Sequence, residues 1–131
     1  MRLLLDTQSF IWWMEENSRL AEPAMTAIAD RENDVFLSVV SSWELALLVQ
    51  RQRIQIPAPL PEYVRSRVAS NSLQVLPVTL PHTFAVFDLP AIHRDPFDRM
   101  LIAQAIVEGL VLVTSDRAIT QYDVPVLLAH R

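Results

Sequence analysis

The chain has 131 residues, a length that suits one domain, and 51% of them are hydrophobic while 20% are charged. This balance excludes an intrinsically disordered chain, and the absence of cysteine excludes disulfide bonds and thiolate metal sites. The formal net charge of −4 is unusual for a protein that binds nucleic acid, although bound divalent cations would offset part of it.

Short apolar runs alternate along the chain with longer segments of helical periodicity. The apolar runs predict strands at residues 2–5, 34–38, 73–76, 110–113 and 124–128. The periodic segments predict helices at 7–14, 24–31, 41–53, about 60–70, 81–87, 95–108 and 116–121, with Gly109 ending the helix at 95–108. Such alternation predicts a single α/β domain over residues 1–131, with a mostly parallel central sheet and helices on both faces.

The sequence contains no stretch that approaches the roughly 20 apolar residues needed to cross a bilayer. The apolar run at the N-terminus is interrupted by Asp6, so it is too short for the core of a signal peptide. We therefore expect a cytoplasmic protein without a membrane partner.

Four acidic residues are predicted to meet at one edge of this sheet. Asp6 directly follows the first strand, and Asp116 comes shortly after the fourth. Glu44 lies in the first turns of the helix after the second strand, and Asp98 lies in the first turn of the helix before the fourth. Because open α/β sheets bind ligands at the carboxyl ends of their strands, this edge is the candidate functional site.

Like charges that are held close together repel, and a hard divalent cation relieves the repulsion. Ligation by carboxylates alone suits Mg²⁺ or Mn²⁺, so the sequence predicts a site for one of these ions. A zinc site is not expected, because His82, His93 and His130 show no shared ligand spacing.

Each acid also has a structural interpretation. Glu44 fits a capping box that begins at Ser41, and Asp98 fits a similar box in which Asp95 is the N-cap. Asp116 could cap its short helix, and Asp6 could end its strand in a turn. These roles leave open whether each carboxylate is functional, but they do not explain why four of them gather at one edge.

Several segments carry a resemblance to a known family, and they occur in its order and spacing over nearly the whole chain. They are Leu3-Leu-Leu-Asp-Thr7 with Trp12-Trp13, Ser41-Ser-Trp-Glu44-Leu-Ala46, His93-Arg-Asp-Pro-Phe-Asp-Arg99-Met-Leu-Ile-Ala-Gln104 and Leu112-Val-Thr-Ser-Asp116. The chain resembles the PIN-domain proteins, specifically the VapC-like toxins of type II toxin–antitoxin systems. The Asp-Pro-Phe-Asp-Arg run is the most distinctive of these motifs.

The resemblance implies a Mg²⁺- or Mn²⁺-dependent endoribonuclease that cleaves RNA with a water activated by the metal. It assigns Asp6, Glu44, Asp98 and Asp116 to the catalytic and metal-binding site. Asp6 and Asp98 are the strongest candidate ligands, and Asp116 would complete or orient the metal shell. Glu44 would bind a second metal or help to deprotonate the water. The resemblance also implies a homodimer and a small cognate antitoxin that binds operator DNA.

Further residues would support this site. The resemblance makes Asp95 and Thr114 alternative ligands or supports for the ligands. Arg99 would contact a phosphate or pair with Asp95, and the sequence favours neither. The tryptophans Trp12, Trp13 and Trp43 are assigned to packing in the core or at an interface. The apolar residues Phe84, Phe87 and Leu89 are assigned to an interface with another copy of the chain or with the antitoxin.

Two other interpretations remain open. A phosphatase with an aspartyl nucleophile also uses an Asp after its first strand, but it needs a second Asp two residues on, where this chain has Gln8. A catalytically silent metal-binding or PIN-like interaction module would keep the acids without cleaving RNA. Compared with the family, Gln8 stands at a position where histidine is common, Leu48 where lysine is common, and Asp123 where glycine is usual.

Overall fold

The computed structural model describes residues 1–130, which fold around one five-stranded sheet of order β3-β2-β1-β4-β5. Each neighbouring pair of strands is parallel. The strands are β1 (Arg2–Leu5), β2 (Asp34–Ser38), β3 (Gln74–Leu76), β4 (Val111–Thr114) and β5 (Val126–Leu128). The predicted α/β class with a parallel sheet is confirmed.

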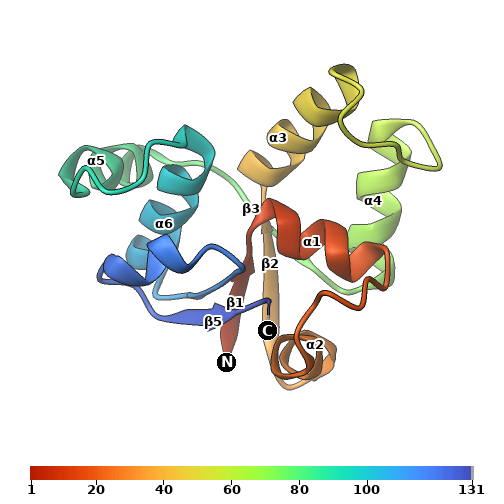
Figure 1. Ribbon diagram of the computed structural model, residues 1–131, viewed down its shortest axis with the longest axis horizontal. Coiled ribbons are helices and arrows are strands. Elements are labelled where there is room, and N and C mark those ends of the chain that lie inside the picture. The colour runs from red at the N-terminus through yellow and green to blue at the C-terminus, as the bar shows by residue number, and fades with distance from the viewer. Residues whose placement is uncertain (131) are drawn as a thin grey trace.

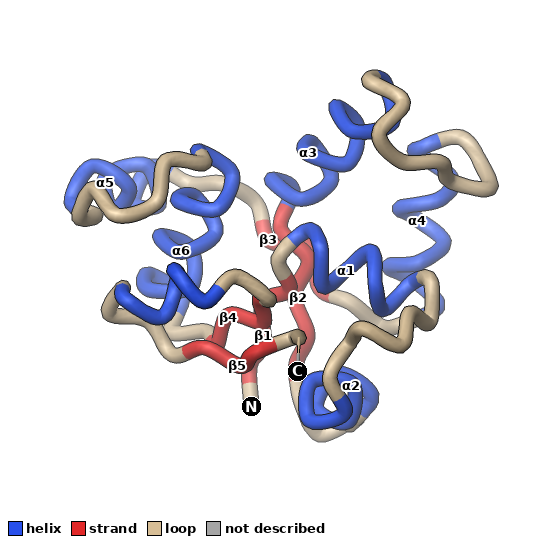
Figure 2. The backbone as a smooth tube through the Cα atoms, viewed as in Figure 1, coloured by secondary structure: helices blue, strands red, loops and turns tan. Residues whose placement is uncertain are grey.

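Helices cover both faces of the sheet (Figure 1). They are α1 (Thr7–Met14), α2 (Glu22–Ala29), α3 (Val39–Gln50), α4 (Leu60–Ser70), α5 (Leu80–Asp88), α6 (Pro96–Glu108) and the 3₁₀ helix η1 (Arg117–Gln121). Helices α1 to α4 lie on one side of the strands, and α5, α6 and η1 lie on the other (Figure 2). No helix within residues 1–130 is both long enough and apolar enough to cross a membrane.

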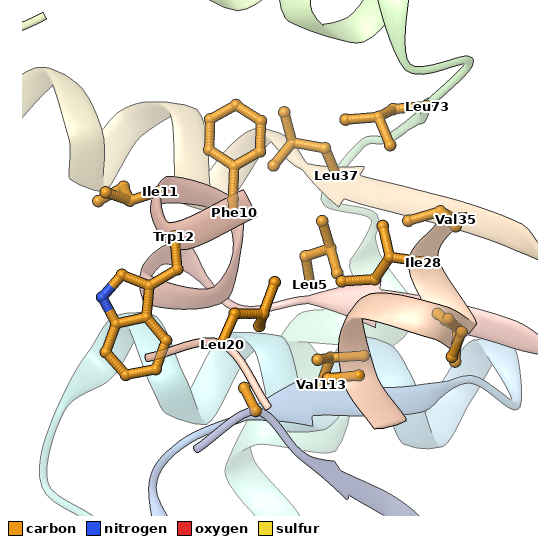
Figure 3. Packing of buried hydrophobic residues seen from close by; sticks show 14 of the residues in the cluster. Leu5, Phe10, Ile11, Trp12, Leu20, Ile28, Val35, Leu37, Leu73 and Val113 are labelled. Atoms are coloured by element: carbon orange, nitrogen blue, oxygen red, sulfur yellow. The ribbon is translucent and has the colours of Figure 1, made fainter. Parts of the chain in front are cut away.

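The central strand β1 is buried on both faces, which explains its uninterrupted leucine run. Leu3, Leu4 and Leu5 are all fully buried. Because successive side chains of a strand point to opposite faces, Leu3 and Leu5 join the core beneath α1 to α4, where Figure 3 shows Leu5 among Phe10 and other apolar residues. Leu4 joins the second core beneath α6. The sheet is thus packed between two apolar layers.

Helix α3 begins two residues earlier than the sequence predicted. Ser38 is its N-cap, because the Ser38 hydroxyl accepts a hydrogen bond from the Val40 backbone N–H at 3.0 Å. Ser41 therefore lies inside the helix, and the capping box that would have occupied Glu44 does not form. The Glu44 side chain instead contacts the Thr7 hydroxyl, outside its own helix.

The strand order reverses between β1 and β4, the position at which open α/β sheets bind ligands. The two strands are held in register where they end, since the Asp6 backbone N–H donates to the Val113 carbonyl at 3.0 Å. Asp6 follows β1, and Asp116 follows β4 by two residues. The fold thus places one carboxylate on each side of the position at which the strand order reverses.

Candidate functional site: an acidic hollow at the sheet edge

The four predicted acids line one hollow of about 210 Å³ at the carboxyl edge of the sheet. They reach it from the end of β1, from α3, from the first turn of α6 and from the turn after β4. The complete lining is Asp6, Thr7, Gln8, Ile11, Glu44, Leu48, Asp98, Ser115 and Asp116. The predicted convergence of acids far apart in the sequence is therefore present in the structure.

Asp6 is the most deeply buried of these acids, with 6% of its surface exposed. It is also the N-cap of α1, because its Oδ1 accepts a hydrogen bond from the Ser9 backbone N–H at 2.7 Å. Burial raises the pKa of Asp6 above its usual range, while hydrogen bonds from Ser9 and Thr114 act in the opposite direction. The structural and functional interpretations of Asp6 are thus compatible, since one carboxylate oxygen caps the helix.

Asp98 also has a strongly perturbed carboxyl group. Burial, together with the negative charges of Asp95, Asp6 and Glu44, raises the pKa of Asp98 from 3.8 to about 7, against a smaller opposing effect of His93. Its neighbour Asp95 has a capping role, as predicted: Asp95 Oδ1 accepts hydrogen bonds from the backbone N–H groups of residues 97 and 98. The Asp98 carboxylate is therefore presented by a helix terminus whose cap is supplied by another residue.

His93 joins the acidic cluster, and the sequence had not assigned it there. Its Nε2 lies 2.6 Å from Asp116 Oδ2 and 3.2 Å from Asp98 Oδ2. The other oxygen of Asp116 caps η1 by accepting the Ala118 backbone N–H at 2.9 Å. The only sequence signal for His93 was its place in the motif His93-Arg-Asp-Pro-Phe-Asp98, two residues before the N-cap of α6.

The hydroxyl groups of Thr7 and Thr114 hold neighbouring groups in place at and beside the hollow. The Thr7 hydroxyl donates to Glu44 Oε1, and Thr7 also contacts the Ser41 hydroxyl at 3.1 Å. Partial burial raises the pKa of Glu44, while the hydrogen bond from Thr7 lowers it. Thr114 is fully buried, and its hydroxyl accepts the Asp116 backbone N–H at 3.1 Å. Thr114 thus stabilises the turn that carries Asp116.

Of the two alternatives that the sequence left open for Arg99, the structure does not show the ion pair with Asp95, and the phosphate contact stays a prediction. Its guanidinium donates to the backbone carbonyls of residues 86, 89, 90 and 93, and to the Tyr122 hydroxyl, at 2.9 to 3.4 Å. These bonds take the place of an ion pair with Asp95. Arg99 therefore fixes the segment between α5 and α6, which carries His93.

The three tryptophans differ in their surroundings. Trp12 is buried in the core, and Trp13 is partly buried beside it, which agrees with the packing role predicted for both. Trp43 is 61% exposed and meets Phe97 edge to face at 4.9 Å, so it is not a core residue. Among the residues assigned to an interface, Phe84 and Phe87 are 63% and 89% exposed.

The donor chemistry of the hollow fits a hard divalent cation. One oxygen each of Asp98 and Asp116 and one nitrogen of His93 lie within 4.8 Å of one another, and these residues form a group that could hold a metal ion. Burial, and after it the repulsion between the acids, raises the pKa values of Asp6, Glu44 and Asp98, so that their ionised forms carry a cost in free energy. A cation would remove that cost.

A parallel sheet that gathers carboxylates where its strand order reverses defines an α/β fold with a candidate site for a polar ligand at the carboxyl edge of its strands. The family model of the PIN domain matches residues 3–125, and the chain belongs to this family.

Known proteins resemble the chain over nearly its whole length. It is 33% identical to Ribonuclease VapC22 of Mycobacterium tuberculosis, over 94% of this chain and 93% of the relative. Its fold matches VapBC2 from Rickettsia felis bound to a promoter DNA fragment, with a TM-score of 0.72, 16% identity and 98% of each chain covered. It also matches DNA-bound VapBC from Salmonella typhimurium, with a TM-score of 0.67, 18% identity and 98% of each chain covered.

Proposed function

We propose that this protein is a metal-dependent endoribonuclease that acts as the toxin of a toxin–antitoxin pair. The observation that carries the proposal is the acidic hollow, in which four carboxylates from four separate elements surround about 210 Å³. Membership of the PIN-domain family and the 33% identity to a ribonuclease support RNA as the substrate.

Asp98 and Asp116 would hold a Mg²⁺ or Mn²⁺ ion together with Asp6. The chemistry that such an ion supplies when bound is Lewis-acid polarisation of the scissile phosphate and acidification of the attacking water. Asp6 is fixed in place by its bond to the Ser9 backbone N–H, which limits the freedom of its carboxylate. The fold thus orders this candidate ligand before an ion binds.

Glu44 is suited to accept the proton of the attacking water. Its carboxylate is only partly buried, and the contact with the Thr7 hydroxyl holds one of its oxygens at the hollow. Partial burial raises the pKa of Glu44 above its usual range, which makes the carboxylate a stronger base. The hydrogen bond from the Thr7 hydroxyl orients the Glu44 carboxylate.

The partners follow from the same proposal. VapBC2 of Rickettsia felis and VapBC of Salmonella typhimurium were solved bound to DNA, and their folds match this chain. We infer a small cognate antitoxin that binds operator DNA, and a homodimer of the toxin. The exposed Phe84 and Phe87 on α5 are available to one of these interfaces.

Cleavage of RNA by the purified protein tests the activity. The protein should cut RNA in the presence of Mg²⁺ or Mn²⁺ and stop in EDTA. Asp6→Asn should abolish cleavage, whereas Asp123→Asn, the same change at an exposed residue away from the hollow, should not. Cleavage that persists in EDTA and in the Asp6 variant would contradict the proposal.

The two rival functions give different results in this assay. A silent binding module would bind Mn²⁺ without cutting RNA, and an aspartyl phosphatase would be trapped by beryllofluoride. The toxin role is tested separately: expression should arrest growth, and the neighbouring open reading frame should reverse the arrest. Growth that continues in the presence of active protein would contradict the toxin role alone.

A further inference from the structure

His93 is fixed by three hydrogen bonds that do not involve its Nε2 atom. Its backbone N–H donates to the buried Tyr122 hydroxyl at 2.6 Å, and its carbonyl accepts from Arg99 at 3.3 Å. Its ring Nδ1 accepts the Asp95 backbone N–H at 3.0 Å. The imidazole therefore has one orientation, with Nε2 directed at the carboxylates of Asp98 and Asp116.

These bonds assign the proton of the ring. A neutral imidazole has one N–H donor and one acceptor nitrogen, and Nδ1 is the acceptor here because it receives the Asp95 backbone N–H. The proton of His93 therefore lies on Nε2. A metal bound at Nε2 would require that proton on Nδ1, where it would face the Asp95 N–H donor directly. In this arrangement His93 acts as a hydrogen-bond donor to the acids, in place of the metal-ligand role that its distances to Asp98 and Asp116 would otherwise allow.

A second histidine shows that the fold uses this arrangement elsewhere for structural purposes. His82 Nδ1 accepts the Thr79 backbone N–H at 3.0 Å, and its Nε2 lies 2.8 Å from Glu108 Oε2. That pair joins α5 to the end of α6 and is not part of the acidic hollow. The difference at His93 is that both of its carboxylate partners line the hollow.

We propose that His93 is a positioning residue for the cation site, and that its Nε2–H group holds the Asp98 and Asp116 carboxylates in the orientation in which they bind the ion. This inference rests on the proposed function, because it assumes that the hollow binds a divalent cation. Groups that orient metal ligands in this way typically contribute 10- to 100-fold to metal affinity.

Two substitutions separate the orienting bond from the anchoring bond. In His93→Gln the amide nitrogen lies near the position of Nε2, so the donor to the acids is retained and the anchor to Asp95 is lost. In His93→Asn the amide oxygen lies near the position of Nδ1, so the anchor is retained and the donor is lost. His130→Asn is the matched control, because His130 is exposed and outside the hollow.

The experiment is titration of the full chain with Mn²⁺ by calorimetry. We expect His93→Asn to bind Mn²⁺ about 10- to 100-fold more weakly than the native protein, and His93→Gln to stay within about threefold of it. A role confined to anchoring the loop predicts the reverse order. Binding by the Asn variant at native strength, or a Gln variant no tighter than the Asn variant, would overturn the inference.

The same titration separates this inference from the proposed function. A native protein that binds no Mn²⁺ would overturn the cation site and the role of His93 together, whereas equal binding by the native and Asn variants would overturn only the role of His93. Long-range ¹H–¹⁵N NMR of the imidazole gives a readout without activity. It should show the Nε2–H tautomer with and without Mg²⁺, and a change to the Nδ1–H tautomer on adding Mg²⁺ would show that His93 is a ligand.

Discussion

Replacing Asp98 with Asn should stabilise the metal-free protein while abolishing its response to Mn²⁺. The native carboxyl group has its pKa raised from 3.8 to about 7 by burial and by neighbouring negative charges. Between these two pH values the folded protein holds a proton on Asp98 that the unfolded chain has released. The free energy of unfolding therefore falls as the pH rises through this window. The full loss of stability from the ionised Asp98 is present above pH 7. The Asn side chain carries no such cost.

The expected gain follows from the size of the pKa change. A difference between 3.8 and about 7 corresponds to about 4 kcal/mol. Solvent reaches 23% of the Asp98 side chain, and the first turn of α6 loses a favourable negative charge, so we expect a net gain of about 2 to 3 kcal/mol. For a domain of this size the melting temperature should rise by roughly 6 to 12 °C at pH 7.5.

Thermal unfolding in EDTA, followed from pH 4 to pH 8, measures this effect. The stability difference between the Asp98→Asn variant and the native protein should be small at pH 4 and should grow up to pH 7. Mn²⁺ should raise the melting temperature of the native protein but not that of the variant, and Asp123→Asn should behave as the native protein does. A variant no more stable than the native protein at pH 7.5, or equally stabilised by Mn²⁺, would refute this reasoning.

Three further predictions concern the scaffold around the hollow. Arg99→Lys should lower the free energy of unfolding, measured by urea denaturation, by about 1 to 3 kcal/mol, because an ammonium group cannot bond the same carbonyls. An unchanged free energy of unfolding would contradict the structural role of Arg99. Gln104→Met should cost about 2 kcal/mol, since it leaves the buried Ser38 hydroxyl and the Pro77 carbonyl without their partner; a neutral effect would show that another group replaces it. Gly109→Ala should lower the free energy of unfolding, measured by thermal unfolding, by about 1 kcal/mol. Gly109 has φ of 67° and an added Cβ would meet no neighbour within 4 Å, so that backbone strain is the only cost. A stabilised variant would contradict the left-handed cap.

The parts of the fold that the sequence predicts well are those set by local patterns. The strand at 2–5 and the helix at 7–14 have the predicted bounds, because an apolar run ends at Asp6 and that residue caps the helix. The end of α6 at Gly109 follows from the only glycine in the chain. The start of α3 was misplaced because serines at both 38 and 41 are suitable N-caps, and the choice depends on where β2 ends.

The convergence of the four acids was predictable, because strand ends and the first turns of helices are fixed by the topology. The contacts of His93 and Arg99 were not, because both depend on the path of the segment between α5 and α6. That path is set by long-range bonds to Tyr122 and to backbone carbonyls, which leave no periodic pattern in the sequence. The exposure of Trp43 also depends on packing between distant elements.

The location of a bound cation tests the central claim most directly. A crystal grown with Mn²⁺ and measured at an anomalous wavelength should show a single strong peak, or a close pair, among the oxygens of Asp6, Asp98 and Asp116. His93 should lie beside the ion without contacting it. An anomalous map with no peak in the acidic hollow, with the four carboxylates still lining it, would contradict the account.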